Sequence, residues 1–215
     1  MNKFWERFFY IFTYITQGSS FLTPRVYAVL HRMHHAYSDT EKDPHSPHQS
    51  NNIFKMMWKT KKVYDMMKDK SKAEYRFLKD LPEWKTIDLL ASTWYSRIGW
   101  GAVYTIFYIF FVPSGMWYLY LLLPIHYLMG PVHGAIVNWA GHKYGYRNFQ
   151  SSDKSKNTLI FDFLTGGELF QNNHHRFPER LNFATRWWEL DPTYPIIKVL
   201  SWLKIIKLQK AVVKE

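Results

Sequence analysis

One internal stretch of the chain is apolar and uncharged, since no Asp, Glu, Lys or Arg occurs from residue 98 to residue 142. A membrane-spanning helix takes about 20 apolar residues, so this stretch is long enough for two. The Pro-Ser-Gly sequence at 113–115 is a tight-turn signal. The pattern therefore predicts a helical membrane hairpin with spans over about 94–112 and 116–139, in which Arg97 reaches back to the interface. The alternative is a pair of buried helices in a soluble protein.

Two shorter segments, one near each end of the chain, have apolar residues at helical spacing with charged residues between them. Each pattern predicts an amphipathic helix that lies on a membrane surface, or else an ordinary helix packed on its own domain. The lysines of the second helix suit anionic headgroups. The apolar faces are Phe4, Trp5, Phe8, Phe9, Phe12 and Ile15, and Ile196, Val199, Leu200, Leu203 and Ile206.

Both flanks of the predicted hairpin are basic. The chain has 215 residues with 28 Lys+Arg and 17 Asp+Glu, and the turn of the hairpin carries no charge. Because positive charge marks the cytosolic side of a span, we expect both flanks in the cytosol. No DNA- or RNA-binding motif accompanies the net charge of +11, which therefore favours an anionic membrane surface over nucleic acid. The absence of cysteine excludes a disulfide scaffold and a thiolate metal site.

Histidines occur in two sets with the spacing of metal ligands. Positions i, i+3 and i+4 of a helix share one face, so each set can converge on a metal ion. Imidazole suits iron, zinc or copper, and the HExxH motif of a common class of zinc hydrolase is absent. The pattern therefore favours iron chemistry on O2. The two sets are His31, His34 and His35, and Gln171, His174 and His175, with Gln171 in the place of a first histidine.

Further candidates lie close to these sets in the sequence. His142 ends the second predicted span on the cytosolic side, and Asn138, one helical turn earlier, is placed to bind a metal through water or to orient His142. Four carboxylates are candidates for orienting imidazole N–H groups, or alternatively are solvated loop charges or helix caps. They are Asp39, Glu41, Asp43 and Glu168.

Three segments resemble the membrane-bound fatty acyl desaturases, in particular the acyl-CoA, delta-9-like branch found in bacteria. They are HRMHHAYSDTEKDPHSP at 31–47, NWAGHKYGYRNF at 138–149 and GGELFQNNHHRFPERLNFA at 166–184, in the order of the family. The resemblance implies an all-α fold in which a membrane hairpin carries a cytosolic, histidine-rich helical cap. It also implies a multi-pass protein, of the bacterial inner membrane, that desaturates fatty acyl chains with O2 and two electrons.

The resemblance also implies a metal centre with two iron ions. A separate electron donor of the ferredoxin or cytochrome b5 type would be needed, because no haem motif of a fused cytochrome occurs. Asn138 would act through water, and Asp39, Asp43 and Glu168 would support the ligands from outside. The implied metal ligands are His31, His34, His35, His142, Gln171, His174 and His175.

The chain departs from the family pattern at its start. No HxxxxH motif, the family's first histidine box, occurs anywhere in residues 1–215. We therefore interpret the chain as one desaturase domain without the N-terminal membrane hairpin and first box, which leaves fewer ligands than two iron shells normally take. Three hypotheses follow. The intact protein is a desaturase, or it is a hydroxylase or ketolase of the same histidine-box superfamily, or the 215-residue chain is a non-catalytic remnant.

Overall fold

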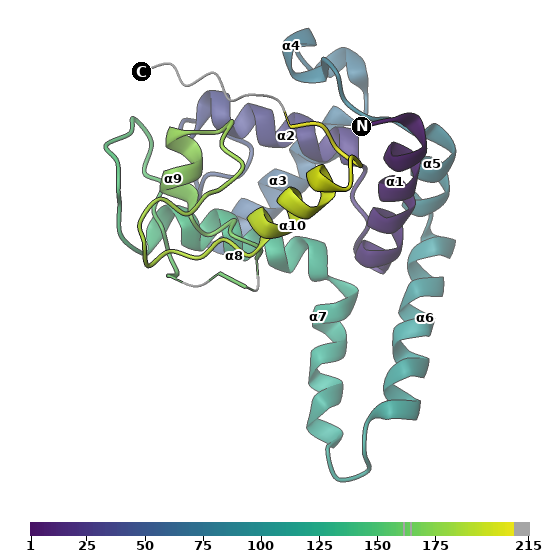
Figure 1. Ribbon diagram of the computed structural model, residues 1–215. Coiled ribbons are helices and arrows are strands. Elements are labelled where there is room, and N and C mark those ends of the chain that lie inside the picture. Colours follow the sequence, from purple (N-terminus) through teal and green to yellow (C-terminus); the bar gives the residue numbers. More distant parts are fainter. Residues whose placement is uncertain (161, 164, 209–215) are drawn as a thin grey trace. The chain divides into compact units, whose positions relative to one another are not determined.

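The computed structural model describes residues 1–160, 162–163 and 165–208 (Figure 1). Within these residues the regular structure is helical and no strand forms, which confirms the all-α prediction. Short 3₁₀ turns, η1 (Gly18–Ser20), η2 (Pro47–Gln49), η3 (Lys70–Lys72) and η4 (Trp117–Leu122), connect several of the α-helices. The α-helices are α1 (Lys3–Gln17), α2 (Pro24–Tyr37), α3 (Ile53–Met67), α4 (Tyr75–Leu78), α5 (Lys85–Ser92), α6 (Trp94–Phe111), α7 (Leu123–Tyr127), α8 (Met129–Lys143), α9 (Gln171–Arg176) and α10 (Thr193–Trp202).

The chain divides into two compact units. The first unit contains residues 1–2, 31–63 and 135–215, and the second contains residues 3–30 and 64–134. Helices α2, α3 and α8 each contribute residues to both units. All the histidine sets predicted as metal ligands belong to the first unit.

The second unit contains a hairpin built from α6 and the η4–α7 segment (Figure 1). Thr93 begins α6 as its N-cap, accepting a hydrogen bond from the backbone N–H of Ser96 at 3.2 Å. The returning segment packs on α6, where the hydroxyl groups of Thr105 and Tyr127 lie 2.6 Å apart. Helix α6 thus coincides with the first predicted span.

The second predicted span, 116–139, is wrong as a single helix. The chain there forms η4, α7 and α8, and α8 is bent by 78° from the segment before it. Pro131 has no backbone N–H and cannot bond the carbonyl group of Tyr127, so the helix restarts at Met129. The hydroxyl group of Ser19 donates to that carbonyl at 2.9 Å, and the N–H of Gly130 donates to the hydroxyl of Ser20 at 2.9 Å.

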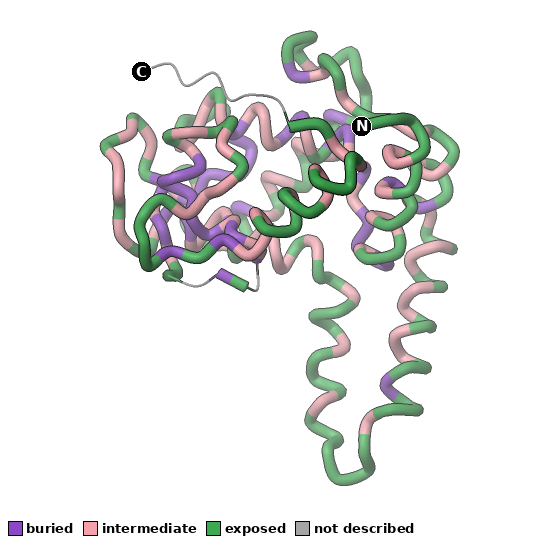
Figure 2. The backbone as a smooth tube through the Cα atoms, in the orientation of Figure 1, coloured by how far each residue is buried: buried purple, intermediate pink, exposed green. Residues whose placement is uncertain are grey.

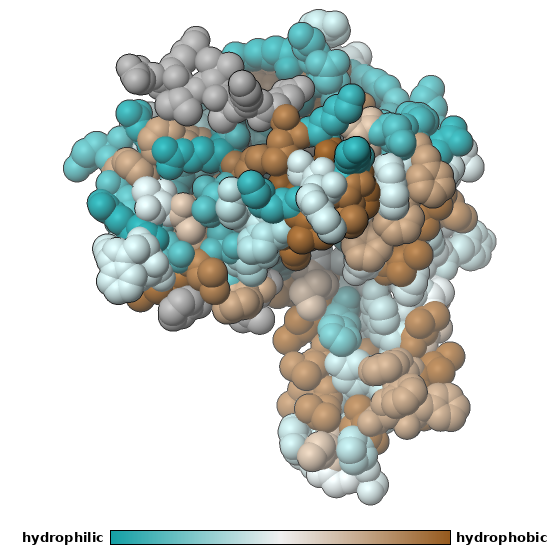
Figure 3. Space-filling view, viewed as in Figure 1, coloured by the Kyte–Doolittle hydropathy of each residue, from teal (hydrophilic) through white to brown (hydrophobic). Residues whose placement is uncertain are grey.

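Within the described residues no single helix is both long and apolar enough to cross a membrane. One bent pair, Trp117–Tyr127 with Met129–Lys143, meets that test together. The hairpin nevertheless exposes a large apolar surface, since Phe110 is 77% exposed and Trp117 is 69% exposed. Figure 2 shows α6 and α7 as a mixture of exposed and half-buried residues, and Figure 3 shows many apolar side chains on the visible face of this hairpin.

Helix α1 forms as predicted but buries the opposite face from its apolar one. Tyr10 packs with Phe21 and Ala91 in a small core, and its hydroxyl group donates to Asp88 at 2.7 Å. Several residues of the predicted apolar face stay exposed. Those exposed by more than a third are Phe4, Phe8, Phe12 and Ile15.

The C-terminal amphipathic helix is shorter than its apolar pattern. Helix α10 ends at Trp202, so Leu203 and Ile206 lie beyond it. The end follows from Lys204, whose backbone has a left-handed φ of 57°. Ile196 and Val199, within the helix, are exposed.

Candidate metal centre

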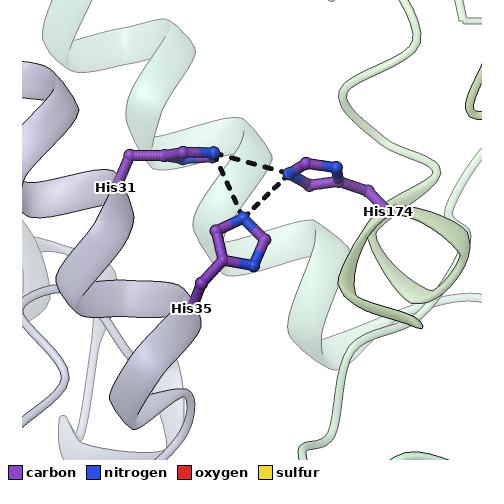
Figure 4. Close-up of side chains that lie close together, drawn as sticks. All are labelled: His31, His35 and His174. Atoms are coloured by element: carbon purple, nitrogen blue, oxygen red, sulfur yellow. Dashed lines mark hydrogen bonds between the residues drawn. The ribbon is translucent and has the colours of Figure 1, made fainter. Parts of the chain in front are cut away.

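Two groups of three histidines lie in the first unit. The first, called here the His31 group, contains His31 and His35 from α2 and His174 from α9. Their three Nε2 atoms face one another (Figure 4). The Nε2 of His35 lies 3.1 Å from that of His31 and 2.9 Å from that of His174. The Nε2 atoms of His31 and His174 are 3.4 Å apart.

The second group, called the His34 group, contains His34 from α2, His142 from α8 and His175 from α9. The Nε2 atoms of His34 and His175 lie 3.2 Å apart. The Nε2 of His142 is buried and has no hydrogen-bond partner. The rings of the three histidines pack with centroids 4.8 to 4.9 Å apart.

The three histidines of α2 therefore do not converge on one point, although they share one side of the helix. Successive residues of an α-helix turn by about 100°, so His35 points about 40° from His31 and about 100° from His34. His31 and His35 form one pair, while His34 turns to the other group. Each group then combines α2 with the histidines that follow far along the chain.

The nitrogen separations in the His31 group, and that between His34 and His175 in the second group, match those required around a metal ion. Two nitrogens about 2.1 Å from one metal ion stand about 3.0 Å apart at right-angle coordination and about 3.4 Å apart at tetrahedral coordination. The measured Nε2 separations run from 2.9 to 3.4 Å. A set of imidazoles without thiolate suits iron, and a buried, unpartnered Nε2 on His142 is the atom that such an ion would satisfy.

Each histidine of the His34 group binds a carboxylate through its second ring nitrogen. An imidazole bound in this way keeps its proton on Nδ1 and its lone pair on Nε2, which is the tautomer that a metal requires. The Nδ1 pairs are His34 with Asp43 at 2.9 Å, His142 with Asp39 at 2.9 Å, and His175 with Asp153 at 2.5 Å.

Asp39 joins three segments of the first unit. Its carboxylate accepts from His142, from the backbone N–H of Lys154 at 2.8 Å and from the hydroxyl of Ser46 at 2.8 Å. Its own N–H donates to Asp43 at 2.8 Å. The backbone of Asp39 is left-handed, with a φ of 61°, a conformation in which aspartate and asparagine are enriched.

Comparison with known proteins shows to which family this chain belongs. A sequence model described as fatty acid desaturase matches residues 1–201. The chain belongs to the fatty acid desaturase family. No solved structure matches it.

Curated relatives of this desaturase-family chain include plant and cyanobacterial proteins. It is 29% identical over 204 residues to an acyl-CoA C20 Delta5-desaturase of Anemone leveillei, covering 94% of this chain and 62% of that protein. It is 32% identical over 182 residues to an sn-1 stearoyl-lipid 9-desaturase of a Synechocystis species, covering 83% of this chain and 53% of that protein. A protein of the same name from Anabaena variabilis is 31% identical, with 80% and 60% covered. The chain thus spans little more than half the length of these relatives.

Burial favours the neutral form of four histidines of the desaturase-family chain, His31, His34, His35 and His174. Burial, with the neighbouring charge of His175, lowers the pKa of His31 to about 4 and that of His35 to about 3. The pKa values of His34 and His174 are also lowered, first by burial and then by neighbouring histidines. Neutral imidazoles at pH 7 are the form that binds a metal ion.

The surroundings of the supporting carboxylates shift their pKa values in different directions. Burial raises the pKa of Asp43. Burial also opposes ionisation of Asp39 and Asp153, but hydrogen bonds and charge from His142 and His175 hold the pKa of each well below its usual range. At neutral pH, Asp39 and Asp153 are therefore negatively charged.

Some sequence candidates lie outside these pairs. Gln171 packs against Gly141 of α8 and its amide N–H donates to the carbonyl of Glu168 at 2.7 Å. Asn138 lies on α8 one turn before His142 and is half-buried. The electrostatic neighbours of Glu168 are Asp162 and Asp191. Glu41 is exposed, and its backbone carbonyl accepts from Lys59 at 3.1 Å.

Sequence reasoning missed two features of this site. Asp153 follows two serines in a loop without nearby histidine, so no local pattern marks it. Glu189 is also unmarked, yet its carboxylate accepts from Asn173 at 2.9 Å and thereby holds the helix that carries His174 and His175. The two asparagines at 172 and 173, directly before these histidines, were a signal that could have indicated a hydrogen-bonded support for this helix.

Proposed function

We propose that this chain carries the metal centre of an oxygen-dependent fatty acyl desaturase. The observation that supports this most directly is the pair of three-histidine groups, whose Nε2 atoms face common points in a chain of the desaturase family. Two iron ions, when bound, would supply the O2 chemistry that an unactivated C–H bond requires, because a saturated chain offers no acid–base handle.

The chain's own residues would hold and orient such ions. Each group offers three imidazole nitrogens, which leaves coordination positions open in each. Asp39, Asp43 and Asp153 would keep the proton of their histidines on Nδ1 and the lone pair of Nε2 free. We further propose Gln171 and Asn138 as additional ligands, Asn138 acting through water, and Glu168 as a more distant support.

The substrate would be an acyl chain on coenzyme A or in a lipid. Relatives named for each of these two carriers match this chain. Electrons would come from a separate carrier of the ferredoxin or cytochrome b5 type. The exposed apolar hairpin supports a location in the membrane, for which we propose multiple spans, cytosolic flanks and, in a bacterium, the inner membrane.

The test is expression in a bacterial host whose own desaturases are deleted. We would express the chain, alone and with any coding sequence found to precede it, and measure cellular fatty acids by mass spectrometry. A new double bond is the expected product, and hydroxylated or oxidised products would instead indicate the related hydroxylase or ketolase reaction. An unchanged lipid profile with two irons bound would contradict the proposal.

Metal analysis of the purified 215-residue chain tests the remnant hypothesis separately. Close to two irons per chain are expected from the two histidine groups. Replacement of His142 by alanine should remove one of them, because it deletes the buried Nε2 of the His34 group. A chain that holds no iron would be a non-catalytic remnant.

A further inference from the structure

The two histidine groups differ in the carboxylates that stand behind them. In the His34 group all three imidazoles have a carboxylate on Nδ1, each from a different aspartate. In the His31 group, the Nδ1 of His174 is buried and makes no hydrogen bond. At most two of the three imidazoles of the His31 group can therefore have such support.

This difference affects the tautomers of the histidines. A carboxylate only accepts, so His34, His142 and His175 are set with their protons on Nδ1 and with lone pairs on Nε2. Lone pairs then face each other across the 3.2 Å between His34 and His175, which is unfavourable until a cation lies between them. The His34 group is thus prepared for a metal ion before one arrives.

The His31 group is less well prepared, because a proton on Nε2 of His174 can bridge to His35 at 2.9 Å. A metal ion must displace that proton to Nδ1 of His174. There the proton has no acceptor, since this nitrogen is buried and unpartnered and the ring packs on Phe183 with centroids 4.3 Å apart. Binding in this group therefore leaves a buried donor unsatisfied.

The charge of the aspartates also favours metal binding in the His34 group over the His31 group. Asp39 and Asp153 lie one imidazole away from a metal ion in the His34 group, and Asp43 lies behind His34. The negative charges of Asp39 and Asp153 stabilise a divalent cation across the ring more than neutral surroundings do.

From these contacts we infer that the two metal positions are unequal and fill in order: the His34 group is the tighter site and binds first, and the His31 group is the weaker site and binds second. This inference rests on the proposed function, since it concerns the same metal centre. It adds that the supply of metal determines whether the chain holds one ion or two.

The experiment titrates the metal-free 215-residue chain in mild detergent with Co2+, followed by the visible absorption of the bound ion. Two binding phases are expected, with dissociation constants at least about tenfold apart, the usual smallest effect of such outer partners. His142→Ala should remove the tight phase alone, and His174→Ala should remove the weak phase alone.

Two aspartates of the chain provide a matched pair of variants. Asp39 and Asp80 both have left-handed backbones, with φ of 61° and 55°, and asparagine tolerates this conformation. Asp39 binds His142 whereas Asp80 is exposed. Asp39→Asn should weaken the tight phase by about 10- to 100-fold and leave the weak phase in place, while Asp80→Asn should change neither. Asp153→Asn is expected to act like Asp39→Asn, and circular dichroism would check that each variant folds.

The possible results separate this inference from the proposed function. Two ions bound with one shared affinity, or an Asp39→Asn effect of equal size on both phases, would overturn the order of filling while leaving a two-metal centre intact. A wild-type chain that binds no Co2+, Zn2+ or Fe2+ would overturn the proposed function itself.

Discussion

The charge of Glu168 changes near neutral pH. Burial, together with the nearby carboxylates of Asp162 and Asp191, raises its pKa to about 7 from an ordinary value of 4.5. Asp162 is fully buried and accepts from the backbone N–H groups of Thr165 and Leu169, and Asp191 accepts from that of Thr193. Glu168 therefore lies beside two carboxyl groups whose acceptor atoms are already occupied, and it keeps its proton instead of adding a further charge.

This shift predicts how stability changes with pH. Between pH 4.5 and about 7 the folded chain holds the proton of Glu168 while the unfolded chain releases it, so the free energy of unfolding falls as pH rises through this range. The loss should reach at most about 3.5 kcal/mol, at about 1.4 kcal/mol per pH unit. Glu168→Gln should flatten this dependence in denaturant unfolding in detergent, and Glu179→Gln, at an exposed position, should not.

Glu189 stabilises the helix that carries two of the histidines. Its carboxylate accepts from Tyr146 at 2.6 Å, Asn173 at 2.9 Å and the N–H of Thr185 at 2.6 Å. Burial raises the pKa of Glu189, but these hydrogen bonds outweigh burial and lower it overall. The side-chain amide of a glutamine at this position has one N–H2 group in place of a carboxylate oxygen. That group would face hydrogen-bond donors that the carboxylate now accepts from.

Glu189→Gln is accordingly expected to destabilise the chain by about 1 to 3 kcal/mol, the usual cost of leaving buried partners unsatisfied. It should also weaken Co2+ binding in both histidine groups, since α9 supplies one ligand to each. Denaturant unfolding and the Co2+ titration measure the two effects. Unchanged metal binding in a destabilised variant would show that Glu189 does not position α9.

At the scale of elements, α8 and α9 approach each other at Gly141. A Cβ atom added at Gly141 would lie 2.4 Å from Cγ of Gln171, closer than carbon atoms can approach. At Gly134, also on α8, an added Cβ would meet no atom within 4 Å. Helix α8 thus contains one glycine that its packing requires, Gly141, and one that its packing does not require, Gly134.

These two glycines give a matched prediction. Gly141→Ala should destabilise the first unit by about 1 to 3 kcal/mol through overpacking and should reduce Co2+ binding at the adjacent His142. Gly134→Ala should be neutral or stabilising by up to about 1 kcal/mol, because alanine favours the helix. Thermal unfolding by circular dichroism compares them. Equal effects of the two substitutions would show that the close approach of α8 and α9 is unimportant.

At the scale of the whole molecule, the apolar hairpin of α6, η4 and α7 needs an apolar environment. Its exposed side chains include large aromatic residues. From residue 98 to the end of α7 the hairpin contains no charged residue. Exposed apolar patches of this kind mark contact with a membrane or a partner. The polar contact between Thr105 and Tyr127 lies inside the hairpin and would stabilise it there.

The chain lacks cysteine, so single cysteines can report its topology directly. Ser114 lies in the turn of the hairpin and Ser152 in an exposed loop of the first unit. In sealed vesicles, a membrane-impermeant maleimide should label Ser114→Cys only from the side opposite to the one that labels Ser152→Cys. Labelling of both from one side would mean that the hairpin enters the membrane without crossing it.

The sequence by itself determined the class of the chain and the chemistry it can support. Helical spacing of apolar residues predicted individual helices, and the resemblance to the desaturases implied an all-α fold. Histidines at i, i+3 and i+4 predict imidazole ligands because helix geometry is local. Asp39 and Asp43 were also predictable, since they follow the first histidine set within one loop. Pro131, by contrast, is a break signal in the sequence that the prediction of a single second span did not include.

Only the tertiary structure decided how the histidines divide into two groups. The 100° between His34 and His35 allows either to join His31. The choice depends on His142 of α8 and on α9, which lie more than a hundred residues further along the chain. The pairing of Asp153 with His175 is decided in the same way, by a loop whose composition carries no periodic signal. Spacing along a helix thus sets which side a residue faces, whereas long-range packing sets which residues meet there.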